Sequence, residues 1–214
     1  MTKVTIVAVT QPRITGVDTA EEFIAYTARV SNPGNQQNKE TSAKLLQYLV
    51  RNKHWSPFEM VTVTMEINTT RDIAHQIVRH RSFAFQEFSQ RYANVDSMGT
   101  TVSEARLQDS KNRQASLETD NADLQFSWVA IQESVIDITT NAYNWAIDNG
   151  IAKEVARKVL PEGLTNTRLY MTGSLRSWIH YYQTRADVST QKEHREVAVQ
   201  AGDLLRKEFP SLML

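Results

Sequence analysis

The sequence predicts an α+β fold, a single domain in which long helices flank a small mixed or antiparallel sheet. Residues 61–68 alternate apolar and polar side chains with a period of two, the clearest strand pattern in the chain. Residues 123–149 carry apolar side chains at helical spacing over a long stretch. No repeat, low-complexity tract or linker divides the 214 residues, so one domain over residues 1–214 is expected.

The first sixty residues predict a strand and two helices. Residues 4–9 are apolar and β-branched, which favours a strand. Thr19 and Glu22 have the spacing of a capping box at the start of a helix. Residues 32–35 indicate a turn, and an apolar stripe predicts a second helix over about residues 40–53.

The rest of the chain is expected to be mostly helical. Thr70 can cap a helix that places Gln76 and Arg79, three residues apart, on one face. Residues 93–122 are polar without periodicity, which predicts a loop with a short surface helix. The remaining predicted elements are a helix over 123–149 ended by Gly150, a short helix ending near 160, a strand over 168–172, a helix capped by Ser174 and ending near 185, and a helix from Ser189 to about 209.

Composition excludes several kinds of function. Lys and Arg together number 24, as do Asp and Glu, so no global field draws the chain to nucleic acid or to a membrane. There is no cysteine, which excludes disulfides, thiolate metal sites and cysteine nucleophiles. His, Asp and Glu show no metal-site spacing, so no metal is expected.

The apolar segments of the chain are too short for a membrane span or a signal peptide, which predicts where the protein is located. No apolar run reaches the ~18 residues that suggest a membrane span. The opening strand is too short for a signal peptide. We therefore expect a cytoplasmic protein that does not bind membranes.

Reactive groups are densest in residues 79–92. This stretch holds three arginines, a histidine, a carboxylate and several hydroxyls, interleaved with Phe83, Phe85 and Phe88. Guanidinium groups can bind phosphate through two parallel hydrogen bonds, so the stretch favours an anion or nucleotide site. The alternative is a solvated helix end, where cations suit the C-terminal dipole. From the residues alone both interpretations stay open.

Two other functions use the same residues. A module that binds single-stranded nucleic acid would use residues 79–92 as a basic and aromatic patch, but zero net charge and a single cluster count against it. A hydrolase would need Ser89 and a histidine partner. The chain has no G-x-S-x-G motif, and its five histidines are scattered.

Four ordered blocks of the chain resemble the flavin-dependent thymidylate synthase family. The blocks are Arg79-His80-Arg81 with Ser89 after seven residues, which resembles the signature RHR-x7-S; residues 54–59, which resemble HxSPFE; and residues 156–161 and 175–187, which resemble the last two blocks of the family. The match is good over about 50–92 and 153–192. It is weak over 93–122 and at the N-terminus.

The resemblance implies a homotetramer that binds dUMP and FAD at its subunit interfaces. Methylenetetrahydrofolate would donate the carbon and NADPH would reduce the flavin. The dUMP residues implied are Gln76, Arg79, Glu87, Phe88, Ser89, Gln90, Arg91, Arg157 and Arg185. The FAD residues implied are Ser56, Arg79, His80, Arg81, Glu87, Ser174, Arg176 and His180.

The resemblance gives Arg185 a catalytic role. Arg185 would lie against the uracil ring and favour its N3-ionised form, because a fixed cation stabilises a developing anion. Ionisation at N3 raises the electron density at C5, the atom that receives the methyl group. The alternative is an arginine that binds carbonyl groups at the end of its helix.

The absence of cysteine bears on the reaction. Classical thymidylate synthases attack C6 of dUMP with a cysteine, which this chain lacks. Ser89 is a poor substitute because an alkoxide needs a strong base beside it, so we assign Ser89 to binding. The resemblance then implies that reduced FAD supplies the hydride. Ser174, His180 and Gln90 depart from the usual family residues, which bears on cofactor affinity.

Overall fold

The computed structural model describes residues 2–212 and contains a four-stranded antiparallel sheet. The strands are β1 (Lys3–Val9), β2 (Thr62–Thr70), β3 (Ala84–Glu87) and β6 (Asn166–Ser174). Their order across the sheet is β1-β2-β6-β3, and every neighbouring pair is antiparallel. The predicted α+β class, with a small antiparallel sheet, is confirmed.

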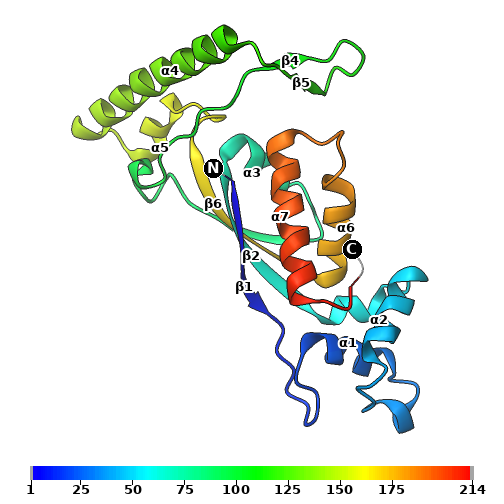
Figure 1. Cartoon of the computed structure of the whole chain (residues 1–214). Coiled ribbons are helices and arrows are strands. Elements are labelled where there is room, and N and C mark those ends of the chain that lie inside the picture. Colours follow the sequence, from blue (N-terminus) through cyan, green and yellow to red (C-terminus); the bar gives the residue numbers. More distant parts are fainter. Residues whose placement is uncertain (1, 213–214) are drawn as a thin grey trace.

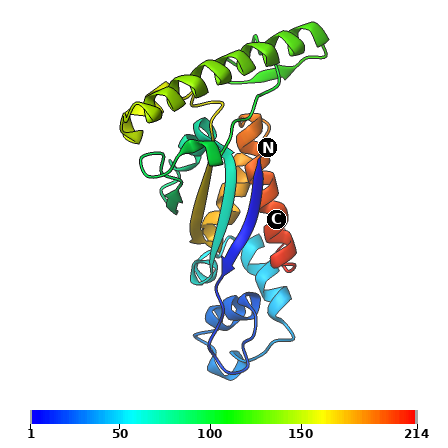
Figure 2. The same cartoon turned by 90° about the vertical axis from the view of Figure 1, so that its left-hand side faces the viewer.

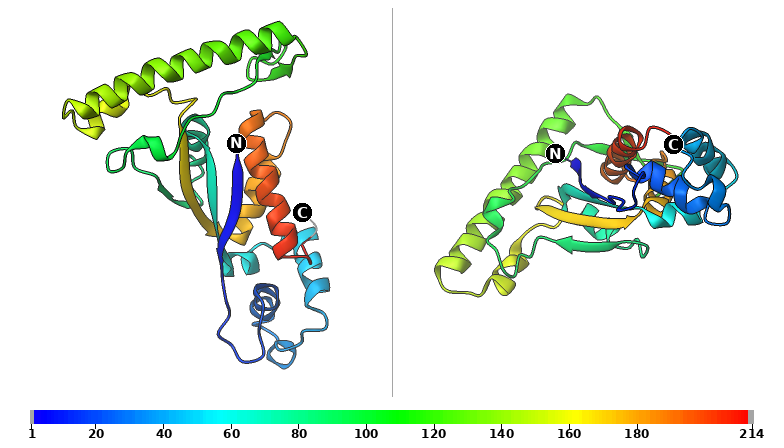
Figure 3. Two further views of the ribbon diagram at one scale, coloured as in Figure 1. Left: turned by 60° about the vertical axis from the view of Figure 1, so that its left-hand side comes forward. Right: turned by 90° about the horizontal axis from the view of Figure 1, so that it is seen from below.

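Helices cover one face of this sheet and both of its ends (Figure 1). In chain order the helices are α1 (Ala20–Ala28), α2 (Ser42–Arg51), α3 (Arg71–Ile77), α4 (Ala122–Asp148), α5 (Lys153–Ala156), α6 (Leu175–Arg185) and α7 (Lys192–Glu208). Figures 2 and 3 show α6 and α7 against the sheet, with α1 and α2 at one end and α4 at the other. No helix of the described residues is long and apolar enough to cross a membrane.

The core lies between the sheet and helices α6 and α7. The period-two pattern of β2 turns Val63, Met65 and Ile67 inward, and all three are fully buried. Trp178 of α6 packs over them and donates its indole N–H to the Val63 carbonyl at 3.0 Å. This bond fixes α6 on the sheet, and α6 carries several of the predicted site residues.

The local signals at two helix starts are confirmed. Thr19 and Glu22 form the reciprocal hydrogen bonds of a capping box at α1. The Ser174 hydroxyl accepts the Ser177 backbone N–H at the start of α6. Thr70 precedes α3, but its hydroxyl donates to the Asp72 carboxylate instead of capping the helix.

Other boundaries differ from the prediction. Helix α3 ends at Ile77, so Arg79 lies in the turn after the helix and not on the expected helical face. The last helix begins at Lys192, three residues after Ser189. Strand β3 was not predicted, since its four residues are too few to establish a period.

The polar segment before α4 also has more structure than expected. It contains a hairpin of β4 (Arg106–Gln108) and β5 (Ser116–Glu118), which was not predicted. Four single turns of 3-10 helix complete the described elements: Pro33–Asn35, Ser56–Met60, Val95–Ser97 and Arg157–Val159. The third of these turns is the short helix expected between residues 93 and 122.

Candidate nucleotide and cofactor site

A cavity of about 450 Å³ opens between the turn after α3 and the outer face of α6. Its lining residues are Trp55, Arg79, His80, Arg81, Ser82, Arg176, Ser177, Ile179, His180 and Gln183. Five predicted FAD residues are therefore gathered here, three guanidinium groups and two imidazoles. Such a set of donors suits an anionic ligand that also carries flat rings.

The α6 wall of the cavity is positioned by the end of strand β6. Helix α6 starts directly after β6. Its residues Arg176 and His180 are four positions apart and therefore lie on the same side of the helix. The guanidinium of Arg176 donates to the Glu59 carboxylate at 2.7 Å. A hydrogen bond from the Ser174 hydroxyl, and to a smaller extent the pairing with Arg176, hold the pKa of Glu59 below its usual range. Glu59 therefore tethers the start of α6 to the segment 56–60.

Two predicted FAD residues stand at the edge of this cavity. Ser56 follows Trp55, which lines the cavity, and its own side chain is exposed. Ser174 caps α6 two residues before Arg176 and also contacts Glu59. Glu59, the partner of both Ser174 and Arg176, lies in the block 54–59 but was not assigned to either ligand.

Arg185 connects the end of α6 to the cluster of residues 79–81. Its Nε donates to His80 Nε2 at 3.0 Å. Since a guanidinium can only donate, His80 accepts this bond with an unprotonated nitrogen. Burial, then the positive charges of Arg185 and His180, lower the pKa of His80. His80 is therefore a neutral acceptor that orients the Arg185 side chain.

Gln76 belongs to a hydrogen-bonded set of polar side chains that runs from the core to the surface. Its amide oxygen lies 3.2 Å from His194 Nδ1, and its Nε2 donates to Gln191 Oε1 at 2.7 Å. His194 Nε2 in turn lies 3.0 Å from the Tyr181 hydroxyl. Sequence reasoning missed Tyr181 and His194, because single polar residues at core positions of α6 and α7 give no distinctive pattern. It also missed Gln191, an exposed residue directly before α7.

The remaining dUMP residues lie at the opposite end of β3. Glu87 accepts hydrogen bonds from Arg71 at 3.1 Å and from Thr167 at 2.8 Å, so its carboxylate is held against β6. Phe88 donates its backbone N–H to the Arg168 carbonyl at 2.9 Å, which continues the pairing of β3 with β6. Arg71, which orients Glu87, was also not predicted.

A shallow hollow follows next to these residues. Ser89 and Arg91 line it together with Glu154 of α5, and Arg91 pairs with Glu154 at 3.4 Å. Gln90 is buried, and Arg157 is half-buried in the turn after α5. A single chain therefore holds the predicted dUMP residues in two places, with Gln76 and Arg185 near His80 and residues 87–91 near α5.

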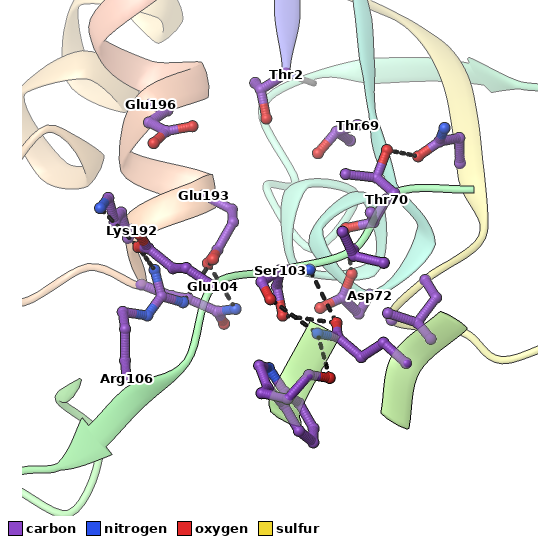
Figure 4. A pocket seen from close by; sticks show the side chains of 18 of the residues that line it. Thr2, Thr69, Thr70, Asp72, Ser103, Glu104, Arg106, Lys192, Glu193 and Glu196 are labelled. Atoms are coloured by element: carbon purple, nitrogen blue, oxygen red, sulfur yellow. Dashed lines mark hydrogen bonds and ion pairs between the residues drawn. The ribbon is translucent and has the colours of Figure 1, made fainter. Parts of the chain in front are cut away.

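A further cavity of about 550 Å³ lies where the start of α7 faces α4 (Figure 4). It contains charged groups of both signs, and these pair with one another. Arg106 binds Glu193, and Lys192 binds Glu104 at 2.6 Å. Because its cations are already neutralised by carboxylates, this cavity suits an anion less well than the arginine-lined one.

Comparison with known proteins places the chain in a family. The model of the thymidylate synthase complementing protein family matches residues 14–211. The chain is 50% identical over 208 residues to the probable flavin-dependent thymidylate synthase of Paramecium bursaria Chlorella virus 1, covering 97% of this chain and 95% of that relative. It is 51% identical over 192 residues to the flavin-dependent thymidylate synthase of Synechocystis sp., covering 90% and 87%.

Solved structures give the same result. The UMP/dUMP methylase PolB from Streptomyces cacaoi, bound with 5-Br dUMP, superposes with a TM-score of 0.82 and 26% identity, covering 99% of this chain and 92% of PolB. Family match, sequence identity and fold thus agree over almost the whole length. The chain belongs to the thymidylate synthase complementing protein family.

Proposed function

We propose that this chain is a flavin-dependent thymidylate synthase, a methyltransferase that converts dUMP to dTMP. Methylenetetrahydrofolate donates the carbon, FAD carries the hydride and NADPH reduces the flavin. The observation that carries the proposal is the gathering of Arg79, Arg81 and Arg176 with His80 and His180 around one cavity. It occurs in a chain of this family that has no cysteine nucleophile.

The cavity has the chemistry that FAD requires. Its guanidinium groups can neutralise a pyrophosphate, and Trp55 and the two imidazoles offer flat surfaces for a ring system. When bound, FAD supplies the hydride that reduces the transferred methylene to a methyl group. The residues proposed to hold FAD at or beside this cavity are Ser56, Arg79, His80, Arg81, Ser174, Arg176 and His180. Glu87, also proposed to contact FAD, lies at the other end of β3.

The same arrangement supports a dUMP site beside FAD. Arg185 is held by neutral His80 and keeps its charge for the uracil ring, where it favours ionisation at N3. Ser89 and Arg91 are exposed, and both can bind phosphate once Arg91 exchanges its ion pair with Glu154 for the ligand. The residues proposed to bind dUMP are Gln76, Arg79, Glu87, Phe88, Ser89, Gln90, Arg91, Arg157 and Arg185.

We propose that copies of this chain complete the site as a homotetramer. The proposed dUMP residues lie in two places within one chain, so a neighbouring chain is needed to bring them around one nucleotide. Helix α4 offers a surface for this contact, because Ile131, Ile138 and Trp145 are 56%, 69% and 62% exposed on one side of it. Apolar side chains in such a row favour association.

We also propose that residues 1–214 act as one domain. The main core draws buried residues from β1 to the segment after α7 and so joins both ends of the chain. A cytoplasmic location stays a prediction of the sequence.

Release of tritium tests the reaction. The protein is mixed with dUMP tritiated at C5, methylenetetrahydrofolate, FAD and NADPH, and label released to water is counted beside dTMP formed. We expect release and dTMP in equal amounts, both lost when FAD is removed. UMP is run in parallel, because the Streptomyces relative is described as acting on both nucleotides. Release that continues unchanged without FAD would reject the proposed reaction.

A further inference from the structure

A line of hydrogen-bonded side chains runs from the core to the surface through Gln76. Tyr181 and His194 form its buried end, with 3.0 Å between the hydroxyl and Nε2. His194 Nδ1 lies 3.2 Å from Gln76 Oε1, and Gln76 Nε2 lies 2.7 Å from Gln191 Oε1. Gln191 Nε2 lies 3.1 Å from Glu193 Oε2. Each link joins one donor to one acceptor, so the direction of the line can be worked out.

The direction can be deduced from the surface end, where the Glu193 carboxylate can only accept. Its other oxygen accepts a hydrogen bond from Arg106 in the wall of the cavity shown in Figure 4. Gln191 must therefore turn its NH₂ group toward Glu193 and its oxygen toward Gln76. Gln76 then turns its own NH₂ group toward Gln191, which leaves its oxygen facing His194.

Only one tautomer of His194 can pair with this orientation of Gln76, and that tautomer in turn helps to hold the Gln76 amide in place. Because an amide oxygen cannot donate, His194 Nδ1 must carry the proton, and Nε2 is left as the acceptor of the Tyr181 hydroxyl. The side chains of His194 and Tyr181 are both buried, so a hydrogen-bond donor without an acceptor between them would be costly. Burial lowers the pKa of His194 to about 4, which keeps the ring neutral.

We propose that Tyr181 and His194 are positioning residues that fix the amide of Gln76 as a hydrogen-bond donor toward the nucleotide. Within residues 2–212, one amide N–H of Gln76 donates to Gln191, and the second is left for an oxygen acceptor of the substrate, such as a carbonyl of the base. The inference deepens the proposed function, because it rests on Gln76 as a dUMP residue. If the ring of His194 carried its proton on Nε2 instead, the Gln76 oxygen would lose its donor, and only the bond to Gln191 would hold the amide.

Two substitutions of His194 separate positioning from packing. Asparagine can place its amide N–H where Nδ1–H stands, whereas glutamine reaches the position of Nε2. We expect His194→Gln to raise the KM for dUMP about fivefold, the effect of one neutral hydrogen bond. His194→Asn should raise it by less than about twofold. Tyr181→Phe, which removes the donor to Nε2, should also raise the KM.

Each variant is compared with the wild type by its melting temperature and flavin absorbance, so that a folding defect is recognised. A role in packing alone would affect His194→Asn and His194→Gln alike, and equal KM values for the two would overturn the inference. A second measurement needs no variant. Spectra of the wild-type protein labelled with ¹⁵N-histidine should place the proton of His194 on Nδ1, and a proton on Nε2 would contradict the proposal.

Gln76→Ala distinguishes failure of the inference from failure of the proposed function. A raised KM for dUMP in Gln76→Ala, together with His194 variants that behave alike, would show that only the positioning role is wrong. An unchanged KM in Gln76→Ala would remove Gln76 from the dUMP site and overturn the inference with it. Lack of dTMP formation by the wild-type protein would reject the proposed function itself.

Discussion

At the scale of single residues, the hydrogen bond from Arg185 to His80 connects the two predicted ligand sets. His80 belongs to the predicted FAD residues and Arg185 to the predicted dUMP residues. Because His80 is neutral, it does not cancel the positive charge of Arg185, and the guanidinium keeps its electrostatic effect on a ligand. Arg71 and Glu59, by contrast, are engaged in ion pairs that orient their neighbours.

Arg185→Ala tests the catalytic role. We expect turnover at saturating dUMP to fall about a hundredfold, the size of effect seen when a preorganised electrostatic group is removed. The unfolding free energy should change by less than ~1 kcal/mol, because Arg185 is only half-buried. Arg51→Ala, an exposed arginine in the last turn of α2, is the control. Full activity of Arg185→Ala would show that the assigned role is wrong.

His194 predicts a pH dependence of stability. Its pKa is about 4 in the folded chain and about 6.5 in the unfolded chain, so the unfolded state binds the proton more tightly. The stabilising contribution is therefore complete above about pH 6.5 and falls as the pH drops toward 4. Between about pH 7.5 and about pH 5 we expect a loss of about 2 kcal/mol in unfolding free energy.

Urea unfolding of the wild type and of His194→Asn at both pH values measures this difference. Carboxylates with lowered pKa, such as Glu59 and Glu66, titrate in both proteins, so their contribution cancels in the comparison. The variant should lose less stability than the wild type on acidification. Equal losses would mean that His194 does not titrate as a buried neutral ring.

Residue chemistry was the part of the site most open to prediction. The arginines and histidine of residues 79–81 and the positions of Arg176 and His180 follow from motif and resemblance, and the structure gathers them around one cavity. Tyr181 and His194 could not be predicted, because a buried polar pair has partners that are distant in sequence. Their roles follow from the packing of α6 on α7.

At the scale of elements, helix α6 and strand β6 act as one continuous support for the site. The strand over 168–172 and the helix cap at Ser174 could both be predicted, because a period of two and a capping hydroxyl are local features of the sequence. Strand β3 was not readable, since its four residues owe their structure to pairing with β6. The hairpin β4–β5 also depends on contacts distant in sequence, since Arg106 of β4 pairs with Glu193 and Glu118 of β5 pairs with Lys192.

Gly173 in β6 predicts how closely this support packs. A Cβ at Gly173 would lie 2.5 Å from a ring carbon of Phe83, which packs edge-on against Trp178. Gly173→Ala should therefore displace Phe83 and reduce the unfolding free energy by about 1–3 kcal/mol. Ser82, the residue before Phe83, lines the cavity. Displacement of Phe83 should therefore lower the affinity for FAD as well.

Thermal unfolding and flavin titration measure both effects of Gly173→Ala. Gly34→Ala is the matched control, because a Cβ at Gly34 meets no atom within 4 Å and its φ is not positive. The control should keep the stability and flavin affinity of the wild type. An unchanged unfolding free energy and flavin affinity in Gly173→Ala would mean that a methyl group fits between β6 and Phe83, contrary to the packing.

At the scale of the whole molecule, α4 is the element that a single chain does not explain. Its apolar spacing was predicted from residues 123–149, but the pattern alone does not say what covers the apolar side. The described chain packs α4 through Gln132, Tyr143 and Ala146 and leaves Ile131, Ile138 and Trp145 exposed. In the proposed homotetramer, a second copy of the chain buries these side chains and brings the proposed dUMP residues together.

Ile138→Asp tests this assembly. A carboxylate in an apolar contact is costly to desolvate, so the variant should sediment as a smaller species than the wild type. Its activity should fall by at least about tenfold, because the site would lack the residues of the neighbouring chain. Glu133→Gln, an exposed residue away from the apolar row, should keep the wild-type size and activity. A dissociated but fully active Ile138→Asp would show that one chain suffices.

One turnover of prereduced enzyme tests whether FAD carries the hydride for the methylation of dUMP. The flavin is reduced beforehand without oxygen, excess reductant is removed, and dUMP and methylenetetrahydrofolate are added while flavin absorbance and dTMP are followed. We predict one dTMP formed for each flavin oxidised, at the same rate. Formation of dTMP while the flavin stays reduced would contradict the account.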